Sequence, residues 1–148
     1  MKPNFMVDDL GVTLNGLRLA VVDSGLLKEQ LRRAGSKEMV NGNYVYYYLD
    51  VEFLSEPFLL CCRFDKGEIA SIWLKWLSGS CAKLGFDSTE AQLLSDTNHI
   101  KNRIRKTNLF SLVEEGYNFA VFSFKKGVLR IGASLQNFEV NIEIFAKK

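Results

Sequence analysis

Few side chains in this 148-residue chain could carry out acid–base or nucleophilic chemistry. The single histidine, His99, has Asn98, Ile100 and Lys101 as neighbours, and none of these supplies a partner for proton transfer or a second metal ligand. Its place near the start of a predicted helix indicates a surface role. Cys81 closes a Ser-Gly-Ser-Cys loop in which no spaced histidine would activate the thiol. We therefore expect no enzymatic activity, and Cys81 is the last candidate nucleophile.

Cofactor and metal motifs are missing from the sequence. It contains no Gly-x-Gly-x-x-Gly, Walker-type or Gly-x-Ser-x-Gly segment, and no Cys-x-x-Cys pair. The three cysteines are an odd number without regular spacing, which favours a reducing compartment over a disulfide framework. The sequence shows neither a signal peptide nor a long apolar run that could span a membrane. We expect a cytoplasmic protein without cofactor or metal.

The composition indicates one ordinary globular domain over residues 1–148. Apolar residues make up 47% and charged residues 24%, and the net charge is only +2. One basic helix face could contact phosphate. Acidic residues follow it closely and no aromatic residue is interleaved, so a solvated face is favoured over a nucleic-acid site. This secondary basic face consists of Lys101, Arg103, Arg105 and Lys106.

The elements that would position any site are strands. Residues 44–77 contain three runs of aromatic and β-branched residues separated by Ser-Glu-Pro and Asp-Lys-Gly, which predicts a three-stranded meander. Its first strand alternates two sets of side chains. We assign to the core Val45, Tyr47, Leu49, Val51 and Phe53, and to the opposite face Tyr44, Tyr46, Tyr48, Asp50 and Glu52.

The rest of the chain predicts further hairpins and two helices. Asn15-Gly16 favours a type I′ hairpin within residues 11–19, and residues 117–145 form a second meander. A helix is predicted near 24–34, capped by Asp23 or Ser24, and another, interrupted or split, over 88–107. Residues 36–43 and 78–85 are predicted loops. The expected fold is α+β, with a twisted antiparallel sheet of about six to eight strands carrying its helices on one face.

One short echo occurs within the sequence. Phe-Asp-Lys-Gly-Glu-Ile at 64–69 matches Phe-Lys-Lys-Gly-Val-Leu at 124–129. Internal duplication could explain the match, but a shared preference for Lys-Gly in tight hairpins is the simpler interpretation.

The tyrosine-rich face is the main candidate site. Its tyrosines could belong to the core beneath a helix. Alternatively they are amphipathic anchors beside two acids and Arg63, a composition typical of protein-binding patches. The candidate partner-binding residues are Tyr44, Tyr46, Tyr48, Asp50, Glu52 and Arg63.

The layout resembles that of small bacterial immunity proteins, the cytosolic antidotes of contact-dependent and polymorphic toxins. The resemblance is carried by the Gly-Val-Thr-Leu-Asn-Gly hairpin, the short capped helix, the meander with Phe-Asp-Lys-Gly-Glu-Ile, the helical middle and the terminal meander. It implies a non-enzymatic inhibitor that binds a cognate toxin domain. The near-neutral charge departs from the strongly acidic antidotes of basic nucleases. The alternative is a small-ligand-binding or chaperone-type domain with a pocket between sheet and helices.

Overall fold

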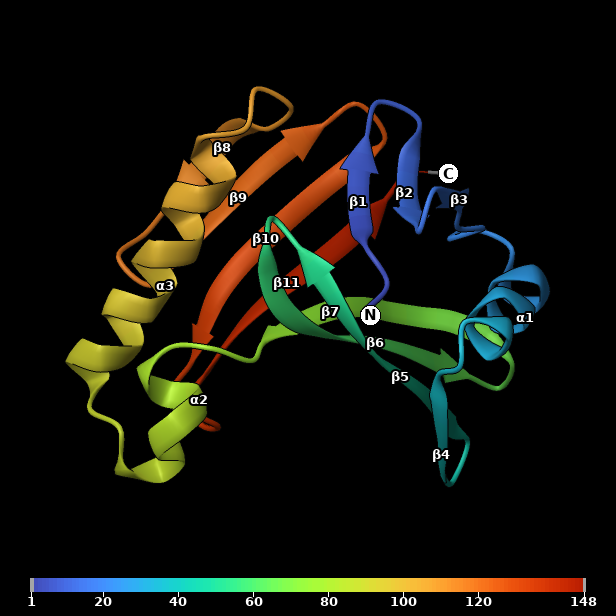
Figure 1. Ribbon diagram of the computed structural model, residues 1–148, viewed down its shortest axis with the longest axis horizontal. Helices are drawn as coiled ribbons and strands as arrows, with labels where there is room; N and C mark the ends of the chain where they lie inside the picture. Colours follow the sequence, from blue (N-terminus) through green and yellow to red (C-terminus); the bar gives the residue numbers. More distant parts are fainter. Residues whose placement is uncertain (1, 148) are drawn as a thin grey trace.

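The computed structural model describes residues 2–147 and shows an α+β fold with two antiparallel sheets (Figure 1). The larger sheet has the strand order β4-β5-β6-β7-β11-β10-β9-β8, and the smaller has β1-β2-β3. The strands are β1 Phe5–Asp8, β2 Gly11–Leu14, β3 Leu17–Arg18, β4 Lys37–Asn41, β5 Tyr44–Phe53, β6 Glu56–Asp65, β7 Glu68–Trp76, β8 Ser111–Glu115, β9 Phe119–Phe124, β10 Gly127–Ser134 and β11 Glu139–Ala146. The helices are α1 Ser24–Arg33, α2 Ser80–Leu84 and α3 Glu90–Arg105, with a 3₁₀ turn η1 over Gly85–Asp87.

The larger sheet consists of two four-stranded meanders that each run from an edge to the centre. The halves join where β7 pairs with β11, with Ile72 opposite Ile144 and Lys75 opposite Asn141. The predicted meanders at 44–77 and 117–145 are both confirmed. Each also has an outer strand, β4 in the first and β8 in the second, and β4 replaces the loop predicted at 36–43.

The sheet is strongly curved, and its helices lie on one face. Figure 1 shows α3 and α1 toward opposite ends of the sheet, with the β1–β2 hairpin between them. We call the face that they cover the inner face, and the other the outer face. A single apolar cluster fills the inner side, and its members include Leu27 and Leu31 of α1, Ile100 of α3, and Phe64 and Ile142 of the sheet. These side chains stabilise the fold through burial.

The N-terminal residues form a small sheet that the sequence predicts only in part. The type I′ turn at Asn15–Gly16 is confirmed, with φ of +50° and +81°. The strand β1 was not predicted, although Phe5 is fully buried. This sheet joins the larger one through a single parallel bridge between Asn4 and Glu52.

The helix α1 follows the predicted signals. The Asp23 carboxylate accepts a hydrogen bond from the Leu26 backbone amide at 3.1 Å and caps the N-terminus. Beyond the C-terminus, Gly35 takes a φ of +88°, a conformation that glycine adopts without a Cβ clash. Leu27 and Leu31 are buried as expected.

The second helical region differs from the interrupted or split helix predicted over 88–107. It is one continuous helix, α3, from Glu90 to Arg105. Thr89 and Gln92 form a capping box at its N-terminus. Leu93 faces inward, while Ala91 is exposed. The predicted linker at 78–85 contains the short helix α2.

The sequence echo does not reflect an equivalent position in the two halves. The first copy lies at the β6–β7 turn beside the central seam, and the second lies at the β9–β10 turn, one hairpin further out. Gly67 sits within its turn at a φ of +84°. Gly127 already belongs to β10, where a Cβ would lie 2.3 Å from the Phe145 carbonyl oxygen. One glycine is therefore required by backbone conformation and the other by close packing.

Candidate functional site: the outer face of the sheet

The predicted partner-binding residues lie together on the outer face. The alternation along β5 is as expected, because Tyr47, Val51 and Phe53 are buried in the core while Tyr44 and Asp50 are exposed. The register places Arg63 of β6 directly opposite Tyr46. Both α1 and α3 pack on the other side of the sheet, so the alternative in which a helix covers these tyrosines does not fit the described residues.

The three tyrosines form a continuous row of neighbouring rings. The rings of Tyr46 and Tyr48 are parallel within 6° and their centroids are 6.0 Å apart. The Arg63 guanidinium lies 5.2 Å from the centre of the Tyr44 ring, a cation–π contact. Burial raises the pKa of Tyr48, and nearby Cys61 and Tyr46 raise it further. Its hydroxyl is therefore a neutral donor and acceptor at physiological pH.

The charges beside the tyrosines are free to meet a partner. Asp50 and Glu52 are exposed, and neither forms an ion pair within residues 2–147. Arg63 likewise forms no ion pair among these residues, and its guanidinium lies on the Tyr44 ring. Aromatic rings flanked by unpaired charges of both signs suit a partner surface with complementary charges.

The outer face continues beyond the residues that we predicted. Tyr48 is followed across the sheet by Cys61, Trp73 and Glu143 in direct cross-strand register. Cys61 is only 2% exposed although it lies outside the main core, so side chains of the outer face cover it. Trp73 is half-buried and was missed, although alternation along β7 would have placed it on this face.

The thiols are poor nucleophiles. Burial raises the pKa of Cys61 to about 12, with a further contribution from Glu139, and it also raises the pKa of Cys62. Burial likewise raises the pKa of Cys81. A thiol with a raised pKa carries little thiolate at neutral pH, and the thiolate is the reactive form.

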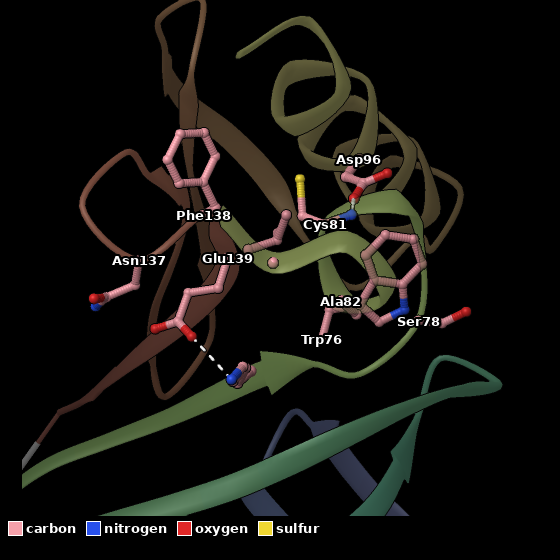
Figure 2. Close-up of a pocket in the computed structure, with 11 residues that line it drawn as sticks. Trp76, Ser78, Cys81, Ala82, Asp96, Asn137, Phe138 and Glu139 are labelled. Atoms are coloured by element: carbon pink, nitrogen blue, oxygen red, sulfur yellow. Dashed lines mark hydrogen bonds and ion pairs between the residues drawn. The ribbon is translucent and has the colours of Figure 1, made fainter. Parts of the chain in front are cut away.

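Figure 2 shows Cys81 beside a cavity between α2, β7 and β11. The buried Asp96 carboxylate accepts hydrogen bonds from the backbone amides of Ser80, at 3.2 Å, and Cys81, at 2.9 Å, and so holds the start of α2. The cavity volume is about 130 Å³, well below the ~300 Å³ at which ligand pockets begin. Cys81 and an acid therefore meet there, but His99 is not among the lining residues.

His99 has structural contacts that its sequence neighbours do not reveal. Its ring stacks on Trp76 with centroids 5.2 Å apart, and its Nε2 lies 3.1 Å from the Glu56 carboxylate. Glu56 also accepts hydrogen bonds from the Trp76 indole N–H and the Arg103 guanidinium. The expected surface position of His99 is confirmed, since its side chain is 49% exposed, but the sequence did not predict that His99 helps to tie α3 to the start of β6.

The predicted basic face is largely neutralised. Lys101 is only 2% exposed, and its ammonium group donates to the Gly116 carbonyl oxygen at 3.0 Å, so its assignment to a solvated face is wrong. Arg103 pairs with Glu56, and Arg105 pairs with Glu115. Lys106 is exposed, and no ion pair involves it within residues 2–147. These pairings leave little basic surface for phosphate.

An apolar groove lies apart from the outer face. It occupies about 320 Å³ between β1, the β5–β6 turn and the segment after α3, and Phe5, Phe53 and Phe110 line it. The β5–β6 turn contains Leu54 and Ser55 at φ of +54° and +62°, a conformation that costs energy for residues other than glycine.

No helix in the described part of the chain combines the length and apolar character needed to cross a membrane. Comparisons with models of protein families, with curated proteins and with solved structures give no match to this chain. The geometry of the outer face is therefore the main guide to function.

Proposed function

We propose that this protein is a non-enzymatic binding module that contacts another protein through the outer face of its larger sheet. The observation that supports this proposal is the stacked pair Tyr46 and Tyr48, flanked by Arg63 and the unpaired acids Asp50 and Glu52. Rigid aromatic side chains lose little entropy on binding, and tyrosine and arginine are enriched among residues that dominate interface energies.

The more specific form of this proposal is a cytosolic immunity protein. In it, the outer face covers a surface of a cognate bacterial toxin domain and blocks its activity, without cofactor or catalysis. The buried, high-pKa thiols and the structural role of His99 favour binding over chemistry. The charges at the site are mixed, which suits a partner with both basic and acidic side chains and not a strongly cationic nuclease.

Co-expression with the product of the adjacent gene tests this function. We expect the two proteins to co-purify, and we expect the chain to protect cells from the neighbour's toxicity. The double variant Tyr46→Ala/Asp50→Lys should lose both effects. The matched control is Tyr117→Ala, because Tyr117 is 65% exposed and lies away from the outer face. A neighbour that is no toxin, or a complex that the double variant leaves intact, would contradict the proposal.

The apolar groove supports a second candidate function, binding of a small apolar ligand. Its volume of about 320 Å³ falls just inside the range of ligand pockets, and its lining is mostly apolar. Substituting Phe110→Asp would place a charge in the groove. Retention of an apolar fluorescent probe by the wild type, and its loss in this variant with the fold intact, would favour this second function.

A further inference from the structure

The two edges of the larger sheet are not equally protected. At one edge, all five residues of β4 are exposed, including Met39 at 53% and Val40 at 66%. No irregularity interrupts its pairing with β5. An exposed, regular edge strand presents unpaired backbone groups that can pair with another strand.

The opposite edge, β8, carries features that discourage such pairing. Its register with β9 shifts between Leu112 and Glu114, which indicates a bulge. Glu114 and Glu115 close the strand, and Glu115 is already paired with Arg105. Bulges and charges of this kind are how natural edge strands avoid association, and β4 lacks the bulge.

The register shows which backbone groups of β4 are open. Asn41 and Tyr44 flank the two-residue Gly-Asn turn, so this closing pair exchanges both backbone hydrogen bonds. Pairs alternate in an antiparallel ladder, and the N–H and C=O groups of Glu38 and Val40 therefore point away from β5. The same alternation explains why the Glu52 amide, on this edge of β5, donates to the Pro3 carbonyl at 2.9 Å.

We propose that two copies of this chain associate through β4, with antiparallel pairing about a twofold axis at Met39. In this register Glu38 of one copy faces Val40 of the other, and each of these pairs exchanges the open backbone bonds. The β4 edges of both copies are satisfied at once, and no β4 edge is left for a third copy. The proposal is independent of what binds the outer face.

Side chains also suit this register. The two Met39 side chains meet at the axis, beside Tyr46 of each copy, because Met39 and Tyr46 are cross-strand neighbours on the outer face. Lys37 faces Asn41 of the other copy, so the lysines are not opposed to one another. Glu38 lies on the inner side, where its carboxylate accepts from Tyr47 at 3.1 Å and neighbours Arg32. Like charges are therefore not directly opposite each other in this register.

A cysteine cross-link tests the register. Residues in a non-hydrogen-bonded pair have Cα atoms about 4.5 Å apart, which a disulfide can bridge, so Met39→Cys should form a covalent dimer on mild oxidation. Val40→Cys is the matched control. Its two copies would be offset by two residues and lie about 8 Å apart, too far for a disulfide. The three natural cysteines are buried and should not interfere. Equal cross-linking at both positions would overturn the proposed pairing.

Sedimentation over a range of concentrations tests the association itself. We expect the wild type to reach twice the monomer mass, and Val40→Pro to remain a monomer, because proline removes the outward N–H without touching the bonds to β5. Val40→Thr keeps that N–H and should still dimerise. Leu112→Lys, at the other edge, should leave the dimer intact. A wild type that stays monomeric at the highest concentration, or a folded Val40→Pro variant that still dimerises, would refute the proposal.

Discussion

The carboxylate of Glu56 offers the clearest test of how the helix α3 is attached to the sheet. Its side chain is 15% exposed and accepts from the Trp76 indole at 3.1 Å, from His99 at 3.1 Å and from Arg103 at 3.2 Å. Glu56→Ala removes all three contacts and leaves the buried indole N–H without an acceptor. We expect this variant to be less stable than the wild type.

The magnitude follows from the exposure of each partner. A hydrogen bond from a buried donor to a charged acceptor contributes about 1.5–3 kcal/mol. The His99 and Arg103 side chains are 49% and 37% exposed, so each of their pairs adds only about 0–1 kcal/mol after solvent screening. The free energy of unfolding should fall by about 2–4 kcal/mol, which corresponds to a Tm loss of roughly 6–12 °C.

Glu56→Gln is the matched control, because its amide keeps an acceptor for Trp76 while losing the charge. We expect a smaller loss of about 1–2 kcal/mol. Burial would raise the pKa of Glu56, but the hydrogen bonds from His99, Trp76 and Arg103 outweigh it, so the pKa is lowered. The carboxylate therefore stabilises the fold above its unfolded pKa of about 4.3, and this contribution is lost as the pH falls through the folded value.

Urea unfolding followed by circular dichroism, at neutral pH and at about pH 3.5, measures these differences. The difference in free energy of unfolding between the wild type and Glu56→Gln should be smaller at the lower pH. If the free energy of unfolding of Glu56→Ala lies within about 0.5 kcal/mol of the wild-type value, the contacts of Glu56 do not hold α3 to the sheet and the reasoning is wrong.

Two further outcomes follow from burial and backbone geometry. The three thiols, Cys81 included, should react with a disulfide reagent at pH 8 at least tenfold more slowly in the native protein than in urea, because burial raises their pKa values. Rapid labelling of the native protein would contradict the buried position of the thiols. Gly79→Ala should lower the free energy of unfolding by about 3 kcal/mol or more, because its Cβ would lie 2.3 Å from the Trp76 ring and its φ is +89°. Gly42→Ala, with open space around it, should lower the free energy of unfolding by about 1 kcal/mol. Equal losses of stability in thermal unfolding would argue against this packing.

Alternation and turn chemistry carried most of the sequence prediction. Buried strands such as β5 show a clear two-residue period because one face must enter the core, and Asn15–Gly16 favours one turn type. The edge strands β4 and β8 escaped prediction because all their residues are exposed. Backbone hydrogen bonds to the neighbouring strand stabilise them, and such bonds do not require an alternating pattern of side chains.

The candidate site divides in the same way. The tyrosine face could be predicted because its residues alternate along one strand. The roles of His99 and Lys101 could not, since Glu56 lies 43 residues before His99 and Gly116 lies 15 residues after Lys101. Contacts of this kind depend on how helices dock, which local periodicity does not report.

The central seam has a consequence for how the chain could be assembled. Within residues 2–147, four residue pairs from Ile72–Ile144 to Lys75–Asn141 join the strand ladders of the two meanders. The helix α1 packs on the first half, and α3 packs on β10 and β11 of the second half while also contacting Glu56 and Trp76 of the first. A break after Ser78 would leave α1 with strands β1 to β7 in one fragment, and α2 and α3 with strands β8 to β11 in the other. Such fragments could serve as a split protein, because their association would complete one strand ladder and one hydrophobic core.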